Sequence, residues 1–287
     1  MSSCPIATGL ASRVTLNDDT ELPLFGYGTS KISYDSDLTE LTKEVTLHAL
    51  QLGYRLIDTA QRYGTEEGVG LAIKQSAIPR SQIFVVSKVW LSNMGYDRCV
   101  KSVYKSLHTL GLQYVDLFLV HCPCPNGQSV ETYKALLDCK EKGIIRSVGV
   151  SNFDVVHLRG LRDAGCPPPS VNQIELNAFF RQRELVEYCR QENIAVMGYS
   201  PLSKGTGMND PTLKAIAKKH KKSVAQAMIR WSVQNGFITI PKSAKFERIS
   251  DNCDVFDFSL DHQDLAAIDE LPESACAWTP YLQPWLG

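Results

Sequence analysis

The chain has 287 residues, of which 44% are hydrophobic and 21% charged, and its formal net charge is -1 at pH 7. This composition belongs to a globular protein able to bury a large core, and the near-zero charge disfavours nucleic acid or an anionic membrane as a partner. No stretch approaches the roughly 20 apolar residues that cross a bilayer, and the amino terminus lacks the basic start and apolar run of a signal peptide. The nine cysteines are scattered without a C-x-x-C pair, which favours reduced thiols in a cytoplasmic protein.

The first element in chain order is a predicted β-hairpin over residues 14–24. Polar and apolar residues alternate along this stretch, and the polar cluster Asn17-Asp18-Asp19 supplies the turn. We expect the hairpin to close one end of the core.

Short apolar runs then alternate with amphipathic segments, and eight such pairs follow one another without a break. The runs begin near residues 25, 55, 83, 115, 147, 171, 195 and 237. Several, such as 115–120 and 194–199, are almost continuously hydrophobic, which indicates strands covered on both faces. Eight consecutive strand-helix units predict an α/β fold, a closed (β/α)8 TIM barrel, as a single domain over residues 1–287, with the hairpin closing its bottom.

Helical spacing of apolar residues is clearest in three of the intervening segments, 38–52, 100–110 and 224–231. Gly53 suits the left-handed conformation that ends the first of these helices. Ser223 is a good amino-terminal cap for the last one, and Gly236 a good stop after it.

A doubly wound nucleotide-binding sheet is the alternative fold. It would require G-x-G-x-x-G after the first strand, but the stretch Gly26 to Lys31 reads GYGTSK and lacks the third glycine. Gly68-Val69-Gly70 fails in the same way, and the sequence has no phosphate-loop motif. The barrel is therefore the favoured fold.

In a barrel of this kind, the active site lies at the carboxyl ends of the strands. Asp58 ends the second apolar run and Tyr63 follows in a loop, while Lys88 and His121 end the next two runs. Taken alone, Asp58 and Tyr63 are equally compatible with a structural role, in which the acid caps a turn and the tyrosine packs. The full set at strand ends is Thr29, Asp58, Lys88, His121, Ser151, Asn152, residues 173–177, Tyr199, Ser200, Lys242 and Ser243.

Asp58, Tyr63, Lys88 and His121 together predict a specific chemistry. An isolated buried ammonium is costly, so we expect Lys88 to pair with Asp58. A cation beside Tyr63 favours the phenolate, which would lower the tyrosine pKa from about 10 and make it usable as an acid or base nearer neutral pH. With His121 donating a hydrogen bond to a substrate oxygen, the set suits carbonyl reduction and lacks the nucleophile-base pair of covalent hydrolysis.

At this point the chain resembles the aldo-keto reductase superfamily over essentially its whole length. Three segments carry the resemblance: 53–64, 136–153 (LLDCKEKGIIRSVGVSNF) and 240–252 (IPKSAKFERISDN). The resemblance implies that Asp58, Tyr63, Lys88 and His121 form a catalytic tetrad. In it Tyr63 is the general acid for reduction, Lys88 and Asp58 tune the tyrosine, and His121 orients the carbonyl.

The resemblance also implies the cofactor NADP(H), lying across the barrel mouth. Lys242, Ser243 and Arg248 match the 2'-phosphate pocket, which suits a dianion and disfavours NADH. Tyr199 matches the residue that stacks on the nicotinamide, and Asn252 the one near the adenine. The remaining implied contacts are Gly28, Thr29, Asp58, Ser151, Asn152, Gln173, Ser200 and Leu202.

Four residues are candidates for contact with a small-molecule carbonyl substrate. His121 would bind its oxygen, and Trp90 matches an aromatic that lines the pocket, although a rim tryptophan that covers the core is the alternative. Arg62 precedes the tyrosine and could meet an acidic or polar substrate, although exposed arginines usually have no specific role. Cys122 stands where many relatives have a bulky aromatic, which implies a differently shaped pocket.

The loop after His121 and the tail after Asn252 are short. The chain therefore resembles the branch with broad carbonyl reductases, 2,5-diketogluconate reductases and prostaglandin F synthases. Reduction of a prostaglandin endoperoxide is the alternative activity, and an NADPH-sensing binding subunit a third, less favoured one. The aromatic tail residues Trp278, Tyr281 and Trp285 either contact a substrate or pack on the barrel.

Two weaker signals favour ordinary explanations. The fragment His121-Cys122-Pro123-Cys124 lacks the second pair or distant histidines of a zinc site, so no metal is predicted. The basic run 218–222 is expected at a solvated helix end rather than at a nucleic-acid or membrane surface. We expect a monomer.

Overall fold

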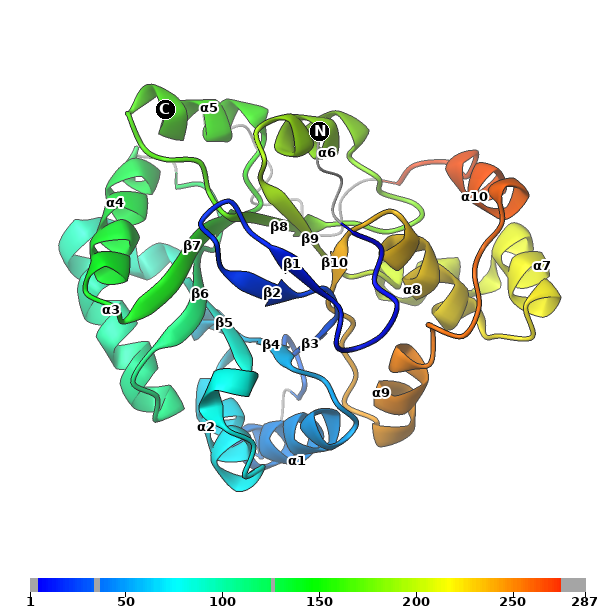
Figure 1. Ribbon diagram of the computed structural model, residues 1–287, viewed down its shortest axis with the longest axis horizontal. Coiled ribbons are helices and arrows are strands. Elements are labelled where there is room, and N and C mark those ends of the chain that lie inside the picture. The colour runs from blue at the N-terminus through cyan, green and yellow to red at the C-terminus, as the bar shows by residue number, and fades with distance from the viewer. Residues whose placement is uncertain (1–4, 34–36, 125–126, 275–287) are drawn as a thin grey trace.

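The computed structural model describes residues 5–33, 37–124 and 127–274. Within this part of the chain, eight parallel strands form one sheet in the order β10-β9-β8-β7-β6-β5-β4-β3. A parallel bridge between Phe25 and Thr239 joins the first and last strands, so the sheet closes into a barrel (Figure 1). The strands are β3 (Gly26–Gly28), β4 (Leu56–Asp58), β5 (Phe84–Val89), β6 (Val115–Val120), β7 (Ile145–Ser151), β8 (Val171–Glu175), β9 (Ala195–Tyr199) and β10 (Ile238–Thr239). The predicted (β/α)8 TIM barrel is confirmed.

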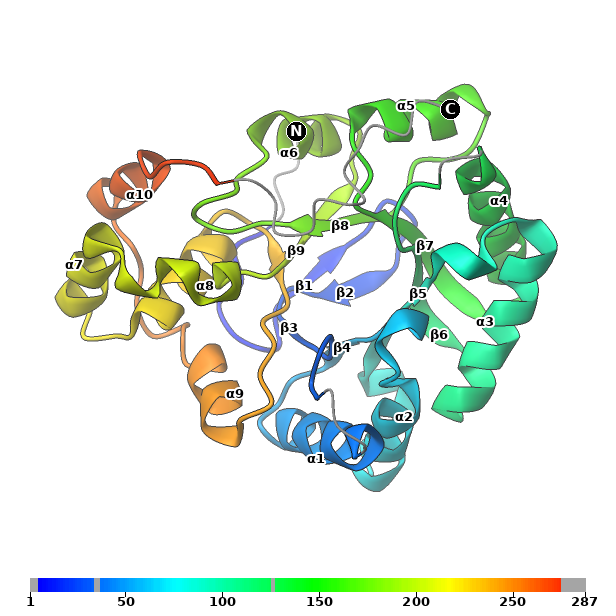
Figure 2. The same ribbon diagram turned by 180° about the vertical axis from the view of Figure 1, so that it is seen from behind.

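The helices surround the sheet and cover its outer face, as both ribbon views show (Figures 1 and 2). They pack against strands whose side chains are buried almost without exception, for example all six residues of β5 and of β6. The helices are α1 (Leu38–Gln51), α2 (Glu66–Gln75), α3 (Tyr96–Leu110), α4 (Gln128–Glu141), α5 (Val155–Asp163), α6 (Arg183–Gln191), α7 (Pro211–Lys219), α8 (Val224–Gln234), α9 (Phe246–Cys253) and α10 (His262–Asp269).

The predicted hairpin is present as β1 (Arg13–Thr15) and β2 (Glu21–Pro23), which pair antiparallel. Its turn contacts the amino ends of the barrel strands, because Asn17 donates to the carbonyl oxygens of Pro169 at 3.0 Å and Asn193 at 3.2 Å, just before β8 and β9. In Figure 1 the hairpin crosses the barrel in front of the strands, and in Figure 2 it lies behind them. It closes the bottom of the barrel, as predicted, and leaves the carboxyl ends at the opposite face.

The predicted helix ends are also present. Gly53 follows α1 with φ of +102°, a backbone conformation that residues other than glycine rarely adopt. Ser223 caps α8 in a capping box with Gln226, and Gly236 follows that helix with φ of +74°.

The strict strand-helix alternation changes after β9, where two helices, α7 and α8, precede β10. Asp210 caps α7 and a proline occupies its first turn, so these two residues start a separate helix. The basic run 218–222 lies at the end of α7, as expected. There Lys219 pairs with Asp261 and Asp264 of the same chain.

Candidate active site

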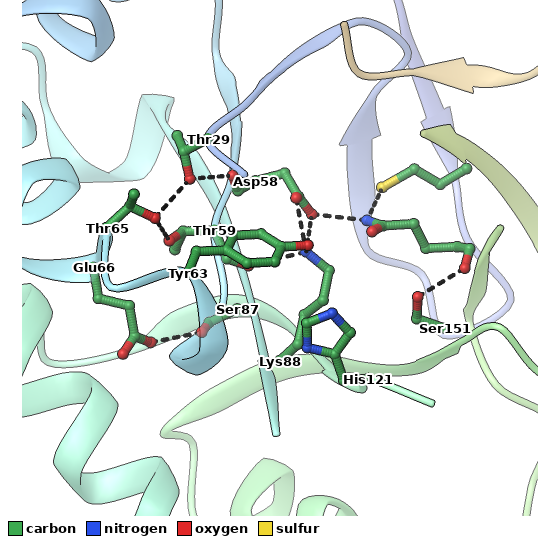
Figure 3. Close-up of polar contacts among 12 residues, drawn as sticks. Thr29, Asp58, Thr59, Tyr63, Thr65, Glu66, Ser87, Lys88, His121 and Ser151 are labelled. Carbon is green, nitrogen blue, oxygen red and sulfur yellow. Dashed lines mark hydrogen bonds and ion pairs between the residues drawn. The ribbon is translucent and has the colours of Figure 1, made fainter. Parts of the chain in front are cut away.

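A buried ion pair is the centre of the site at the carboxyl ends of β4 and β5. The Lys88 Nζ lies 2.7 Å from Asp58 Oδ1 and 2.8 Å from Oδ2, and neither side chain has appreciable contact with solvent. The same ammonium donates to the backbone oxygen of Thr59 at 3.0 Å and to the Tyr63 hydroxyl at 3.3 Å (Figure 3). Burial has the largest single effect and lowers the pKa of Lys88, but the charges and hydrogen bonds of Asp58 and Tyr63 together outweigh it and raise the pKa, so the lysine stays charged. The predicted pair of Lys88 with Asp58 is present.

Tyr63 lies on the short turn η1 (Gln61–Tyr63) that follows β4, with its hydroxyl directed at the ion pair (Figure 3). Lys88 does lower the pKa of Tyr63, but the expectation that this pKa falls below its ordinary value of about 10 is wrong. Burial raises the pKa of Tyr63, Lys88 opposes this effect, and Asp58 adds to it. Burial has the largest effect, and Tyr63 therefore remains a protonated phenol at neutral pH.

His121 follows β6 and faces the tyrosine. The ring centroids of His121 and Tyr63 are 5.5 Å apart with an edge-to-face angle of 83°, and those of His121 and Trp90 are 5.0 Å apart. Burial lowers the pKa of His121 well below its usual range, and the positive charges of Lys88 and Arg62 lower it further. A neutral imidazole that can donate one N–H without carrying charge therefore stands beside the tyrosine hydroxyl.

The wall of the mouth beyond the tetrad residues comes from β7, β8 and β9. Asn152, at φ of +59°, donates to the backbone oxygen of His121 at 2.9 Å and accepts from the Tyr199 hydroxyl at 2.8 Å. Gln173 donates to Asp58 Oδ2 at 2.7 Å, and Ser151 donates to the Gln173 carbonyl at 2.8 Å. The structure thus brings the predicted residues Ser151, Asn152, Gln173 and Tyr199 into one hydrogen-bonded group with the tetrad.

The predicted contacts at β3 lie on the other side of Asp58. The amide of Gly28 donates to Pro241 at 3.0 Å, and the Thr29 hydroxyl donates to the Asp58 carbonyl at 2.9 Å. The same hydroxyl is 2.9 Å from that of Thr65, which is 2.8 Å from that of Thr59 (Figure 3). This chain of buried hydroxyls fixes the backbone around Asp58 and was not anticipated from the sequence.

The residues predicted for the phosphates stand on two segments beside the mouth. Lys242 and Ser243 follow β10, while Arg248 and Asn252 are on α9, with both cations exposed and Asn252 buried. Ser200 and Leu202 follow β9 and are half-buried. Although the Lys242 side chain is exposed, partial desolvation by neighbouring atoms lowers its pKa, and the nearby charge of Lys31 lowers it further. The Lys242 ammonium donates to the backbone oxygen of Lys31 at 3.1 Å, so two lysines lie close together at the place predicted to receive a phosphate.

The four predicted substrate contacts separate into two groups. His121, Trp90 and Arg62 lie together, with the Arg62 guanidinium 5.4 Å above the Trp90 ring. Cys122 is fully buried and has no surface at the mouth in this conformation, so its substrate contact stays a prediction. The aromatic tail residues 278, 281 and 285 lie outside the described residues.

Two polar residues of the site were missed in the sequence. Gln61 accepts from the Trp90 amide at 3.1 Å and donates to the Ser106 hydroxyl at 3.1 Å, which ties the tyrosine turn to the tryptophan loop and to α3. Glu66 is buried behind the ion pair and accepts from the Ser87 hydroxyl at 2.6 Å. In the sequence, each is only a polar residue close to Tyr63. Polar residues are common in loops, so this signal does not single them out.

Two other kinds of feature are absent from the described part of the chain. No group of three or more His, Cys, Asp or Glu side chains there is arranged to hold a metal ion. No helix among the same residues is long and apolar enough to cross a membrane.

Comparison with known proteins relates the whole barrel to one family. The sequence model of the Aldo/keto reductase family matches residues 25–273. The chain is 42% identical to a glyoxal reductase of Bacillus subtilis (strain 168), over 92% of this chain and 94% of that protein. It is 41% identical to a 9,11-endoperoxide prostaglandin H2 reductase of Trypanosoma cruzi (strain CL Brener), over 91% of each. The crystal structure of a Bombyx mori aldo-keto reductase in complex with NADP superposes with a TM-score of 0.84 at 37% identity, covering 90% of this chain and 92% of that one.

Proposed function

Because the chain belongs to the aldo/keto reductase family, we propose that it reduces aldehydes and ketones to alcohols with NADPH, with Tyr63 as the general acid. The observation that carries this proposal is the Tyr63 hydroxyl 3.3 Å from the Lys88 ammonium, which is paired with Asp58, with the His121 ring 5.5 Å from the tyrosine ring. Such a group donates a proton to oxygen and leaves behind a phenolate that the lysine stabilises.

Each member of the tetrad then has one task. The carbonyl oxygen of the substrate accepts hydrogen bonds from the Tyr63 hydroxyl and from the His121 ring. As the carbonyl carbon receives hydride, its oxygen takes the Tyr63 proton, and the product is a neutral alcohol. Lys88 stabilises the resulting tyrosinate, and Asp58 keeps Lys88 charged and in place.

The bound cofactor NADPH supplies the hydride. The donor set of this chain suits it, because Lys242 and Arg248 offer two cations and Ser243 a hydroxyl for its 2'-phosphate. The mutual repulsion of Lys242 and Lys31 would be relieved by a phosphate dianion between or beside them. The nicotinamide end of the cofactor would be held by Ser151, Asn152, Gln173 and Tyr199. The remainder of the cofactor would be held by Gly28, Thr29, Ser200, Leu202 and Asn252.

The test is NADPH oxidation with the purified chain and a panel of reactive aldehydes such as para-nitrobenzaldehyde. We expect turnover that depends on the aldehyde and is much weaker with NADH. No turnover over a broad carbonyl panel, with protein shown to bind NADPH, would contradict the proposal.

Reduction of a prostaglandin endoperoxide is the second candidate activity, supported by the 41% identity to the Trypanosoma cruzi enzyme. Rates on an endoperoxide and on a simple aldehyde, measured with the same preparation, separate the two. A higher kcat/KM for the endoperoxide would make it the better substrate class.

A further inference from the structure

Arg62 is the exposed neighbour of Tyr63, and its guanidinium lies over the Trp90 ring at the mouth. The guanidinium carbon lies 5.4 Å from the centroid of the Trp90 ring, and that ring is 5.0 Å from the His121 ring. The positive charge of Arg62 contributes to the low pKa of His121, so this charge acts on a member of the tetrad. A cation therefore stands close to the place where the carbonyl of a substrate would bind.

Among the described residues at the tetrad, Arg62 carries a positive charge that no carboxylate pairs with. Lys88 is neutralised by Asp58 at 2.7 Å, and His121 is neutral because of its lowered pKa. Within residues 5–33, 37–124 and 127–274, Arg62 has no carboxylate partner within ion-pair distance. Arg62 therefore adds a positive charge beside the tetrad that no carboxylate of these residues pairs with.

The guanidinium lies over the Trp90 ring and so has a fixed position at the mouth. Its planar set of N–H groups can bind a carboxylate at two points. Gln61 holds the tryptophan in position, because its side-chain oxygen accepts from the Trp90 amide at 3.1 Å and from the Asn93 side chain at 2.8 Å. The cation and its platform thus come from two loops that are bonded to each other.

We propose that Arg62 selects carbonyl substrates that carry a carboxylate, such as oxo acids and formyl acids, by binding that carboxylate while the carbonyl oxygen is held at Tyr63 and His121. The inference rests on the proposed reductase function and specifies its substrate class. A substrate that enters along Trp90 would bring its anionic end to Arg62, and the product would be the corresponding hydroxy acid.

The experiment compares two aldehydes that differ in one charge, para-carboxybenzaldehyde and its methyl ester. The measured quantity is the ratio of their kcat/KM values, acid over ester. We expect Arg62→Met to lower this ratio about tenfold and Arg62→Lys to lower it less, because the lysine keeps the charge but loses the planar grip. Added salt should lower the ratio of the wild type and leave that of Arg62→Met unchanged.

A matched control is Arg159→Met on α5, whose guanidinium also lies 5.4 Å over a ring, that of Tyr188, but on the outer helices. It should leave the ratio unchanged. An unchanged ratio in Arg62→Met, or an equal loss for both aldehydes, overturns the proposal.

A second readout separates this inference from the reductase function. Benzoate binding to the NADP+-loaded protein, measured by calorimetry, should weaken about tenfold in Arg62→Met. If neither aldehyde is reduced but benzoate binding still depends on Arg62, the anion site stands and the reductase function is wrong. If benzoate binding does not depend on Arg62, the anion site is wrong whatever the turnover.

Discussion

The Lys88 ammonium lies within 2.8 Å of both carboxylate oxygens of Asp58, and this pair is shut away from water at the end of two adjacent barrel strands. Taking two charges out of water is costly, and their mutual attraction offsets that cost only when both are present. The pair therefore makes the charge on Lys88 permanent, which a proton donor next to it requires.

Removing one partner of the pair should therefore cost more than removing both. Asp58→Asn leaves the lysine charge buried without compensation, and we expect the free energy of unfolding to fall by about 3 kcal/mol in urea titrations. The double variant Asp58→Asn with Lys88→Met should regain much of that stability while remaining inactive. If the two losses simply add, the pair does not have the coupling that its geometry implies.

Tyr63→Phe tests the proton donor with little change in packing. The variant keeps the ring over which Lys88 lies at 4.8 Å and loses the hydroxyl alone. We expect kcat for aldehyde reduction to fall on the order of a hundredfold or more, with the Kd for NADPH within about twofold of wild type. An activity close to wild type would exclude Tyr63 as the general acid.

The pH dependence of reduction follows from the direction in which the tyrosine pKa moves. The acid form of Tyr63 predominates below its pKa, and burial raises that pKa above the ordinary value of about 10. On the acidic side, His121 stays neutral down to a lowered pKa, below the ordinary value of about 6.5. The profile of kcat/KM should accordingly be level across the neutral range and fall only on the alkaline side of about pH 10. A falling limb near neutral pH would mean that the effect of Lys88 on the tyrosine pKa outweighs that of burial.

Cofactor preference should depend on Lys242. In the proposed pocket, the Lys242→Ala variant loses one charge-assisted contact to the 2'-phosphate, on the order of 1.5 to 3 kcal/mol, whereas NADH has no 2'-phosphate and loses no such contact. Fluorescence titration should show a Kd for NADPH raised at least about tenfold and a Kd for NADH nearly unchanged. Lys74→Ala, on the outer helix α2, is the control for the general loss of one positive charge. If the Kd values for NADPH and NADH rise equally, the 2'-phosphate pocket lies elsewhere.

The parts of the site that depend on where the strands end could be predicted from the sequence. The parts that depend on distances between side chains of different segments could not. Asp58, Lys88 and His121 end three successive apolar runs, and parallel strands bring their carboxyl ends together whatever the exact packing. The direction of the Tyr63 pKa change required the distances of two opposite charges from one hydroxyl. The burial of Cys122 depends on neighbours from other segments, which single-sequence patterns do not show.

Glu66 provides a test of the buried surroundings of the tetrad. Burial raises the pKa of this carboxyl, and hydrogen bonds from Ser87 and Ser106 oppose that change only in part. Since the folded-state pKa is above the unfolded one, the folded protein holds the proton more tightly. Stability is therefore lost as pH rises through the folded pKa, by about 1.4 kcal/mol for every pH unit that separates the folded and unfolded pKa values. Glu66→Gln still accepts from Ser87 and cannot ionise, so its stability relative to wild type should increase from acidic to neutral pH in urea titrations.

The matched control for that experiment is Glu67→Gln, the exposed neighbour on the first turn of the same helix. The stability of this variant relative to wild type should not increase from acidic to neutral pH in the same way, because an exposed carboxylate keeps its hydration in the folded and unfolded states. A Glu66→Gln variant that loses stability at neutral pH would show that the ionised carboxylate is favourable where it is. Glu66 would then act as a second counter-ion of the lysine, whose charge lowers the Glu66 pKa slightly even now.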